Sequence, residues 1–163
     1  GAAKAVEISI VPPSHDSSVN RVLLNEAERR NLEPDNLTLP LGPPSGYVVR
    51  FTNRLVIYLT GDTALHADMK TVVADFHKPN ATVLNLGQSA ITNASGAWIA
   101  DEVIRPATVI ISHPNEAASV GGKARPGSRT AEMSAMLRRP VVPALSGRTM
   151  EFDGQGRCVA GCS

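Results

Sequence analysis

Apolar and polar positions along the chain follow two periodicities, one typical of strands and one typical of helices. Short β-branched runs bounded by Pro, Gly and Asn predict strands at residues 5–11, 46–51, 55–59, 81–86 and 107–111. Apolar residues spaced three and four apart predict helices at residues 22–30, 65–76, 93–103 and 130–137. Residues 52–54 join the second and third strands into a hairpin, after which strands and helices alternate. This order predicts an α/β layer architecture in a single domain, residues 1–163.

Two stretches interrupt the pattern. Residues 19–45 mix charges with Asn, Pro and Gly, and we expect a long inserted loop of the kind that covers a site or stays disordered. Residues 146–163 are expected to form a closing hairpin and tail, with Asp153 and Gly154 in the turn. Cys158 and Cys162 lie four residues apart in this tail, and both a small disulfide loop and two free thiols remain open.

Composition narrows the choice of partners. Hydrophobic residues make up 42% of the 163 positions but aromatic residues only 4%, so the core must consist of Val, Ile, Leu and Ala. A net charge of +1 argues against nucleic acid as a partner, and the basic stretch 123–129 with Arg138 and Arg139 is expected to be a solvated face. No apolar run has the length of a membrane span, and no glycine-rich phosphate loop is present. The processed-looking start and the cysteine pair lean towards a periplasmic or secreted protein.

Side chains that can bind a metal ion follow three of the predicted strands. His15, Asp62 and His113 each lie within a few residues of the end of an apolar run, so all three can reach the same edge of a sheet. Imidazole and carboxylate are ligands of catalytic zinc, which keeps one position open for water. Two simpler interpretations remain: Asp62 or Thr63 caps the following helix, and each histidine is an ordinary surface residue.

Other polar residues near these positions have plainer roles. His66 and His77 fall within and at the end of the helix predicted at 65–76, and we expect both to be ordinary solvated histidines. Glu116 follows His113 closely, and it is expected either to orient His113 or to lie in the first turn of a helix.

A longer motif carries a resemblance to a known family. The run GYVVRFTNRLVIYLTGDTALHADMKTVVADFHKPNATVLNLG, residues 46–87, resembles the metallo-β-lactamase superfamily, in the branch of metal-dependent hydrolases that includes ascorbate-6-phosphate lactonase-like proteins. That branch has a hairpin, a Gly-Asp-Thr turn, a helix with Asp-Met-Lys and a Lys-Pro-Asp or Lys-Pro-Asn before the next strand. The resemblance extends over residues 5–120 and implies three metal ligands: His15 in SHDSS, the metal-bridging Asp62, and His113 after a late strand.

The chain also departs from the family pattern. The first metal motif of the family, His-x-His-x-Asp-His, does not occur in this sequence. The chain therefore resembles only the C-terminal half of the αββα sandwich, for which we expect a mixed sheet with helices on one face. Residues 87–92 read GQSAIT where relatives have Gly-Gly-His-Phe-Thr-Met, and His113 is followed by Pro-Asn-Glu instead of Tyr-Gly.

The resemblance implies a metal-dependent hydrolase that uses a metal-activated water on an ester, lactone, amide or phosphoester of a small molecule. One or two Zn ions are expected, with Mn or Fe as alternatives, and Asp62 would be the catalytic bridging carboxylate. The site would be complete only with an N-terminal half-domain fragment or a second copy of the chain. The alternative is a non-catalytic half-domain that serves as a structural or binding subunit.

Overall fold

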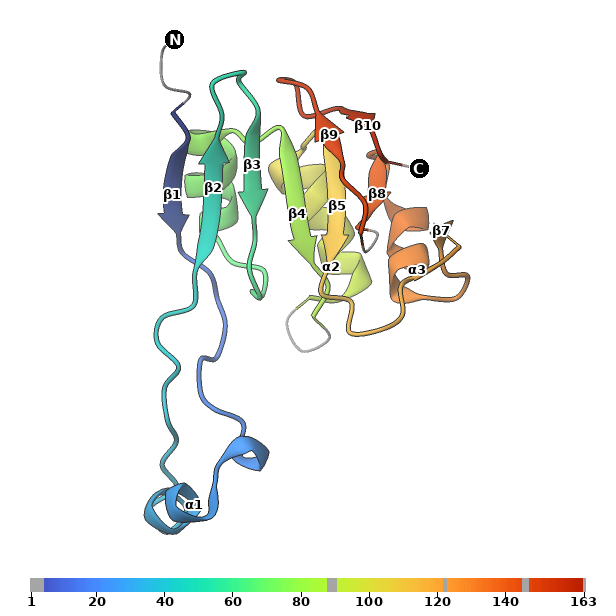
Figure 1. Cartoon of the computed structure of the whole chain (residues 1–163). Coiled ribbons are helices and arrows are strands. Elements are labelled where there is room, and N and C mark those ends of the chain that lie inside the picture. The colour runs from blue at the N-terminus through green and yellow to red at the C-terminus, as the bar shows by residue number, and fades with distance from the viewer. Residues whose placement is uncertain (1–4, 88–90, 122, 145–146, 163) are drawn as a thin grey trace.

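A mixed six-stranded sheet lies at the centre of the molecule (Figure 1). The structure is a computed structural model that describes residues 5–87, 91–121, 123–144 and 147–162. In sheet order the strands are β1 Glu7–Val11, β2 Gly46–Arg50, β3 Val56–Leu59, β4 Ala81–Asn85, β5 Thr108–Ser112 and β8 Val141–Pro143. β1, β2 and β3 pair antiparallel, whereas β3, β4, β5 and β8 pair parallel. The carboxyl ends of β1, β3, β4, β5 and β8 therefore meet at one edge of the sheet.

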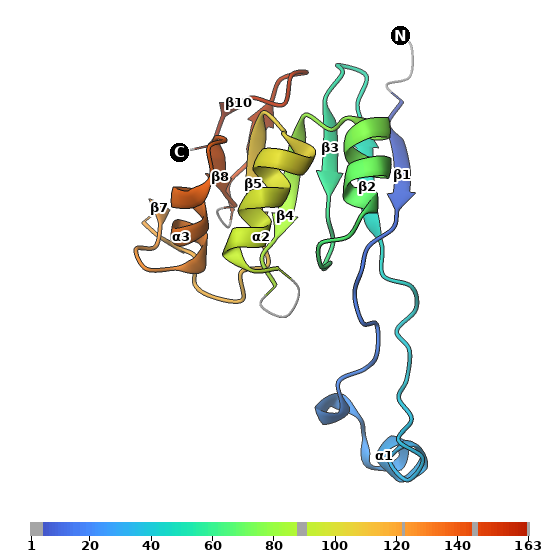
Figure 2. The ribbon, with the colours of Figure 1, turned by 180° about the vertical axis from the view of Figure 1, so that it is seen from behind.

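Helices between the parallel strands cover one face of this sheet (Figure 2). They are η2 Met69–His77, α2 Asn93–Trp98, which continues into η3 Ile99–Ile104, and α3 Arg129–Met136. Each crossover moves one strand further in the same direction, and right-handed crossovers then put all of these helices on the same side. The expected α/β fold with a mixed sheet and helices on one face is confirmed. The N-cap of α2 is Thr92, whose side chain accepts a hydrogen bond from Ser95 N.

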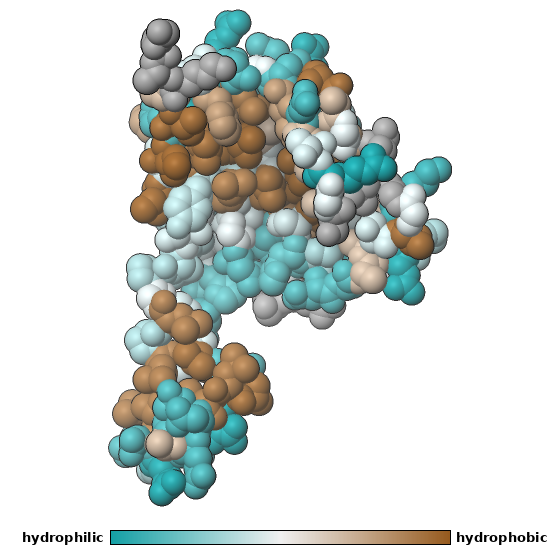
Figure 3. All heavy atoms as spheres, in the orientation of Figure 1, coloured by the Kyte–Doolittle hydropathy of each residue, from teal (hydrophilic) through white to brown (hydrophobic). Residues whose placement is uncertain are grey.

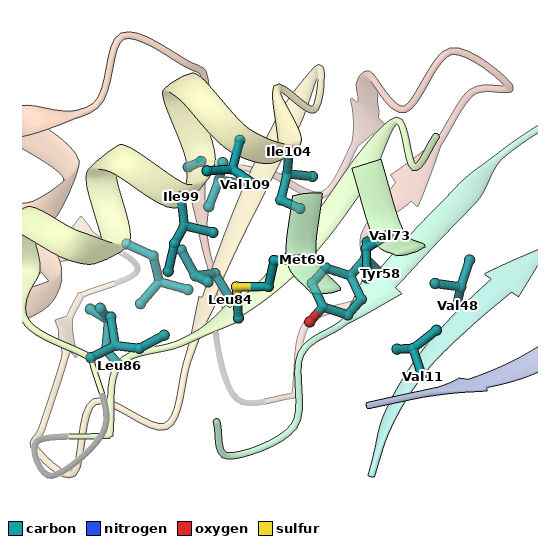
Figure 4. Packing of buried hydrophobic residues seen from close by; sticks show 14 of the residues in the cluster. Val11, Val48, Tyr58, Met69, Val73, Leu84, Leu86, Ile99, Ile104 and Val109 are labelled. Atoms are coloured by element: carbon teal, nitrogen blue, oxygen red, sulfur yellow. The ribbon is translucent and has the colours of Figure 1, made fainter. Parts of the chain in front are cut away.

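Alternation of side chains along the strands makes the two faces of the sheet unlike each other. Val48, Tyr58 and Leu84 point towards the helices and are buried, and Met69 and Ile99 pack against them from the helices (Figure 4). Burying a side chain of this size contributes roughly 1.5–3 kcal/mol. The covered face is therefore the source of most of the stability of the fold.

The opposite face is bare over the antiparallel strands (Figure 3). Cross-strand pairing places two rows of apolar side chains on it: Ile8, Val49 and Ile57, and next to them Ile10, Tyr47 and Leu59. Ile10 is 72% exposed and Tyr47 is 39% exposed, whereas Val48, which points to the helices, is 2% exposed. We call these two rows the bare face. A contiguous exposed apolar surface of this kind is uncommon on a monomeric soluble protein.

Residues 17–41 form an arm that extends away from the edge where the parallel strands end (Figure 1). Two backbone hydrogen bonds, from Val19 N to the carbonyl of Leu39 and from Leu41 N to that of Ser17, hold its sides together. The helices η1 Arg21–Leu23 and α1 Glu26–Leu32 lie at the tip. The short helix expected in this long insertion therefore forms, and it starts at a capping box between Asn25 and Glu28.

Short strands complete the chain. β6 Ser119–Val120 pairs with β7 Lys123–Ala124, and β9 Glu151–Phe152 pairs with β10 Cys158–Ala160 in the expected closing hairpin. Of the two states left open for the cysteines, the structure has the disulfide, Cys158–Cys162. No helix of the described residues has the length and apolar character to cross a bilayer.

The basic residues expected to form a solvated face do so only in part: Arg138 is exposed, but it also links parts of the fold, as do the half-buried Arg129 and Arg139. Arg129 donates to the carbonyl of Ile91 at 3.0 Å and fixes the segment before α2. Arg138 Nε lies 3.4 Å from one carboxylate oxygen of Asp101, and Arg139 Nε lies 3.7 Å from the other. Asp101 is buried, and a buried carboxylate needs such partners because desolvation of its charge is costly.

Candidate metal centre

The three predicted ligands come together at the carboxyl edge of the sheet. His15 follows β1, Asp62 follows β3 and His113 follows β5. His15 Nε2 lies 3.1 Å from Asp62 Oδ2, and His113 Nε2 lies 3.4 Å from the same oxygen. All three side chains are partly open to solvent, so ligands can reach them. Side chains nearly 100 positions apart in sequence thus share one carboxylate oxygen.

A buried hydrogen-bond network fixes the loops that carry these side chains. Ser14 N donates to Thr63 Oγ1 at 2.7 Å, and Ala64 N donates to the carbonyl of Ser14 at 2.7 Å. These two bonds hold the residues next to His15 against the residues next to Asp62. Asn85 Nδ2 donates to the carbonyl of Thr63 at 2.9 Å, and Asn85 Oδ1 accepts from Gly87 N at 2.6 Å. Asn85 is buried, so its amide ties the end of β4 to the turn that presents Asp62.

Gly87 is required by the close approach of these side chains. A Cβ atom at position 87 would lie 2.8 Å from Asp62 Oδ1, 2.9 Å from Asn85 Oδ1 and 3.1 Å from the imidazole of His113. Any larger residue would displace Asp62 or His113. Asp62 Oδ1 itself is buried and has no hydrogen-bond partner. An unpartnered carboxylate oxygen in a buried position is costly unless a ligand satisfies it.

His113 occupies an unusual backbone conformation. Its φ angle is +53°, in the left-handed region that residues with a Cβ atom seldom adopt, and Asn115 has a φ of +55°. Strained backbone of this kind concentrates at functional sites, where it aims a side chain. Glu116 Oε1 accepts from Thr130 N at 3.2 Å, in the first turn of α3. Glu116 therefore serves the helix start, and the structure shows no bond from it to His113 among the described contacts.

The donor set fits a divalent cation of the zinc type. Two imidazoles and a carboxylate match the ligand chemistry of Zn, and the unpartnered Asp62 Oδ1 offers a further donor atom. Both imidazoles lie against the carboxylate of Asp62 itself. For this reason their nitrogens do not surround an open position, and within the described residues no group of three His, Cys, Asp or Glu side chains is arranged as a metal site. The three residues thus fit the expected metal by the type of their donor atoms and by their closeness to one another.

The histidines expected to be solvated are not. His77 is only 9% exposed, and its ring packs edge-on against Phe76 with the ring centres 4.9 Å apart. His66 is half-buried, and its Nε2 is buried without a hydrogen-bond partner. Burial lowers the pKa of His66, and the nearby Asp68 opposes this only in part. His77, the last residue of η2, and His66, in the loop before η2, are therefore both at least partly buried, which corrects the interpretation from sequence.

The residues that position the candidate ligands were not expected from the sequence. Asn85 and Thr63 read as ordinary polar residues, although Asn85 is the last residue of an otherwise apolar strand. An amide at the end of a buried strand needs hydrogen-bond partners, and this was the available signal. Of the segment 87–92, where the chain departs from its relatives, residues 88–90 lie outside the described part of the chain.

Comparison with known sequences supports the metal-dependent hydrolase resemblance. The chain is 33% identical over 94 residues to a UPF0173 metal-dependent hydrolase of Roseiflexus sp., which is 57% of this chain and 38% of the relative. It is 27% identical over 117 residues to one of Polynucleobacter asymbioticus, covering 69% of this chain and 39% of the relative. The chain thus spans about two fifths of the length of the curated relatives it matches. No protein-family model matches it.

Comparison with solved structures supports the fold. The isothiocyanate hydrolase from Delia radicum gut bacteria aligns with a TM-score of 0.56 at 18% identity, over 90% of this chain and 55% of that protein. A protein of Parabacteroides distasonis aligns with a TM-score of 0.53 at 18% identity, over 85% of this chain and 50% of that one. The fold is therefore that of metallo-hydrolases, and the sequence matches agree with the metallo-β-lactamase-like class.

Proposed function

We propose that the chain is the metal-binding C-terminal half of a metal-dependent hydrolase of the metallo-β-lactamase type. The observation that carries the proposal is the convergence of His15 and His113 on Asp62, whose second oxygen is buried and unpartnered. A purely structural half-domain has no need for an unsatisfied carboxylate oxygen next to two imidazoles.

The roles of the residues follow from their chemistry. His15 and His113 would bind the cation through their imidazole nitrogens, and Asp62 would present its two oxygens to one or two ions. Zn fits best, with Mn or Fe as alternatives. A bound ion of this type lowers the pKa of a coordinated water, so that hydroxide is available near neutral pH. The network of Thr63 and Asn85 holds the ligands in place, and the reaction would be hydrolysis of an ester, lactone, amide or phosphoester of a small molecule.

The proposal includes a partner that covers the bare face. The exposed rows around Ile10 and Tyr47 are an apolar sheet surface without a second layer. The chain matches only about two fifths of its relatives, so an N-terminal half-domain is the occupant we propose, and it would add the missing ligands. A second copy of the chain is the other occupant that the test distinguishes.

The Cys158–Cys162 disulfide supports an oxidising compartment, and we propose a periplasmic or secreted location.

Metal binding tests the core of the proposal. We expect calorimetric titration of the metal-free chain with zinc to give at least one site, and Asp62→Ala to weaken it by at least about 100-fold, because losing a ligand exceeds the effect of losing a residue that only orients one. Asp35→Ala removes an exposed carboxylate on the arm and should leave binding unchanged. Absence of zinc binding, or equal binding by Asp62→Ala, would favour the non-catalytic half-domain.

Assembly tests the partner. Size-exclusion chromatography with native mass spectrometry of the material from its source should give the chain together with an N-terminal half. A dimer of this chain alone would replace that partner with a second copy, and a stable monomer would exclude both.

A further inference from the structure

A pocket of about 410 Å³ adjoins the candidate metal centre. It lies between the end of β5, the loop after His113, the start of α3 and the end of β8, and His113 is part of its wall. Pockets that bind small molecules have volumes of roughly 300–1,000 Å³. We call it the α3 pocket. Because one of the candidate ligands lines it, a molecule that reacts at the metal centre would place its neighbouring group there.

The wall of the α3 pocket is built from small apolar side chains. Pro114, Ala117, Ala118, Pro143 and Ala144 line it, together with Ile111 and the hydroxyl side chains of Ser112 and Ser119. The large side chains along the wall are Ile111, His113 and Glu116. Such a lining favours a compact aliphatic group over a polar one.

One polar group in the wall lacks a partner. Thr130 is 2% exposed, and its Oγ1 has no hydrogen-bond partner, although its backbone N–H is bound by Glu116. A hydroxyl can both donate and accept, so it can pair with a carbonyl, amide or hydroxyl of a bound molecule. Buried polar groups are nearly always paired, and a ligand in the pocket would satisfy this one.

The charge of the pocket excludes anions. Among the described residues of the lining there is no Lys or Arg, and Glu116 is a carboxylate at its edge. In the metal-free chain, an anionic group placed there would have no Lys or Arg partner and would be repelled by Glu116.

We infer that the α3 pocket binds the non-reacting part of a neutral substrate: a short uncharged aliphatic group with a single hydrogen-bonding atom, which pairs with the Thr130 hydroxyl. The assignment of this group to a substrate rests on the proposed function, while the binding preference of the pocket does not. The inference selects substrates that carry a neutral aliphatic group next to the reacting bond, and it leaves the type of that bond open.

The test uses four-carbon probes and the full chain. In two-dimensional ¹H–¹⁵N NMR titrations, butyramide should shift the amide signals of Ala117, Ala118, Ser119 and Thr130 with a dissociation constant in the millimolar range. Butyrate, of the same size but anionic, should bind at least about tenfold more weakly because it lacks a cationic partner. Butyrate binding as tightly as butyramide would overturn the inference, as would shifts confined to other parts of the chain.

Variants separate the pocket from general effects. Ala118→Trp should fill the pocket and remove butyramide binding, and Ala117→Trp, in the exposed loop, does the same if the first variant fails to fold. Ala135→Trp, on the exposed side of α3, is the matched control and should bind normally. Thr130→Val should weaken binding several-fold and Thr130→Ser should restore it. Undiminished binding in both pocket tryptophan variants would overturn the inference.

The two proposals can fail independently. Asp62→Ala should lose zinc and still bind butyramide. If zinc binds and butyramide does not, the pocket inference fails alone. If butyramide binds as described and zinc does not, the proposed function fails and the pocket remains a binding site for neutral aliphatic molecules.

Discussion

The two faces of the central sheet are built from the same strands and differ in what covers them. Val48 and Tyr47 are neighbours in β2, yet the first is buried under the helices and the second is open. Both faces are apolar, so the hydrophobicity of the residues alone does not show which face is covered by helices. The chain therefore has a covered apolar layer on one side of the sheet and an exposed one on the other. The predictions below test that difference.

Matched Ile→Ala changes on the two faces should give the largest contrast. Ile111, in β5 on the covered face, is 3% exposed, and Ile111→Ala should lower the free energy of unfolding by about 2–5 kcal/mol through lost burial and a cavity. Ile10→Ala should change it by no more than about 0.5 kcal/mol in the isolated chain. Urea denaturation measures both. A large loss for Ile10→Ala would mean that the bare face is already packed.

Asn85 is an exception on the uncovered face of the sheet. The alternation of side chains along β4 places it on that face, yet the loops of the candidate metal centre bury it. Asn85→Ala should cost about 1–3 kcal/mol, since Gly87 N loses its buried acceptor. Zinc affinity should also fall by about 10- to 100-fold, because the turn of Asp62 loses support. Chemical denaturation and calorimetry give the two values. Asn31→Ala, at an exposed position of α1, is the control and should alter neither.

A charge on the bare face should weaken assembly. If an N-terminal half covers this face, Ile10→Glu should raise the dissociation constant for that half by at least about tenfold, since a buried unpaired charge costs more than 1.4 kcal/mol. Val120→Glu introduces the same charge at an exposed position of β6 and should have no effect. Analytical ultracentrifugation of the mixed halves measures the difference. Equal affinity in both variants would mean that the partner lies elsewhere.

The smallest expected effect concerns pH. Burial lowers the pKa of His66 below its usual 6.5, so below that pH the unfolded chain binds this proton more readily than the folded chain. The folded state should therefore lose stability as pH falls from 6.5 towards the folded pKa, and no such loss arises from His66 above 6.5. His66→Gln should reduce the drop in melting temperature between pH 7.5 and 5.5. If the drop in melting temperature is the same in His66→Gln, other titratable groups cause the loss of stability.

Strand and helix periodicity predicted most of the architecture. The hairpin and the alternation after it follow from apolar spacing and turn residues between 46 and 112, whereas the helices on one face were expected from the family resemblance. β8 was missed because Val141–Pro143 is short and contains a proline, and it pairs with β5 only through tertiary context. The pair β6–β7 was missed because two-residue strands carry no periodicity.

The candidate site was predicted in its ligands and not in its support. A His or Asp after an apolar run is visible in sequence, whereas the convergence of His15, Asp62 and His113 depends on strand order. Asn85 and Gly87 act through contacts with residues more than 20 positions away, and local pattern cannot show such contacts. The burial of His77 likewise comes from packing that composition does not reveal.

The arm begins only a few residues after His15 and ends just before β2, so its two legs leave the sheet beside the candidate ligand. His15 therefore lies between the end of β1 on one side and the start of the arm on the other. The bonds of Ser14 to Thr63 and Ala64 hold this position from the side of the sheet, so the candidate ligand is anchored independently of whatever the arm contacts.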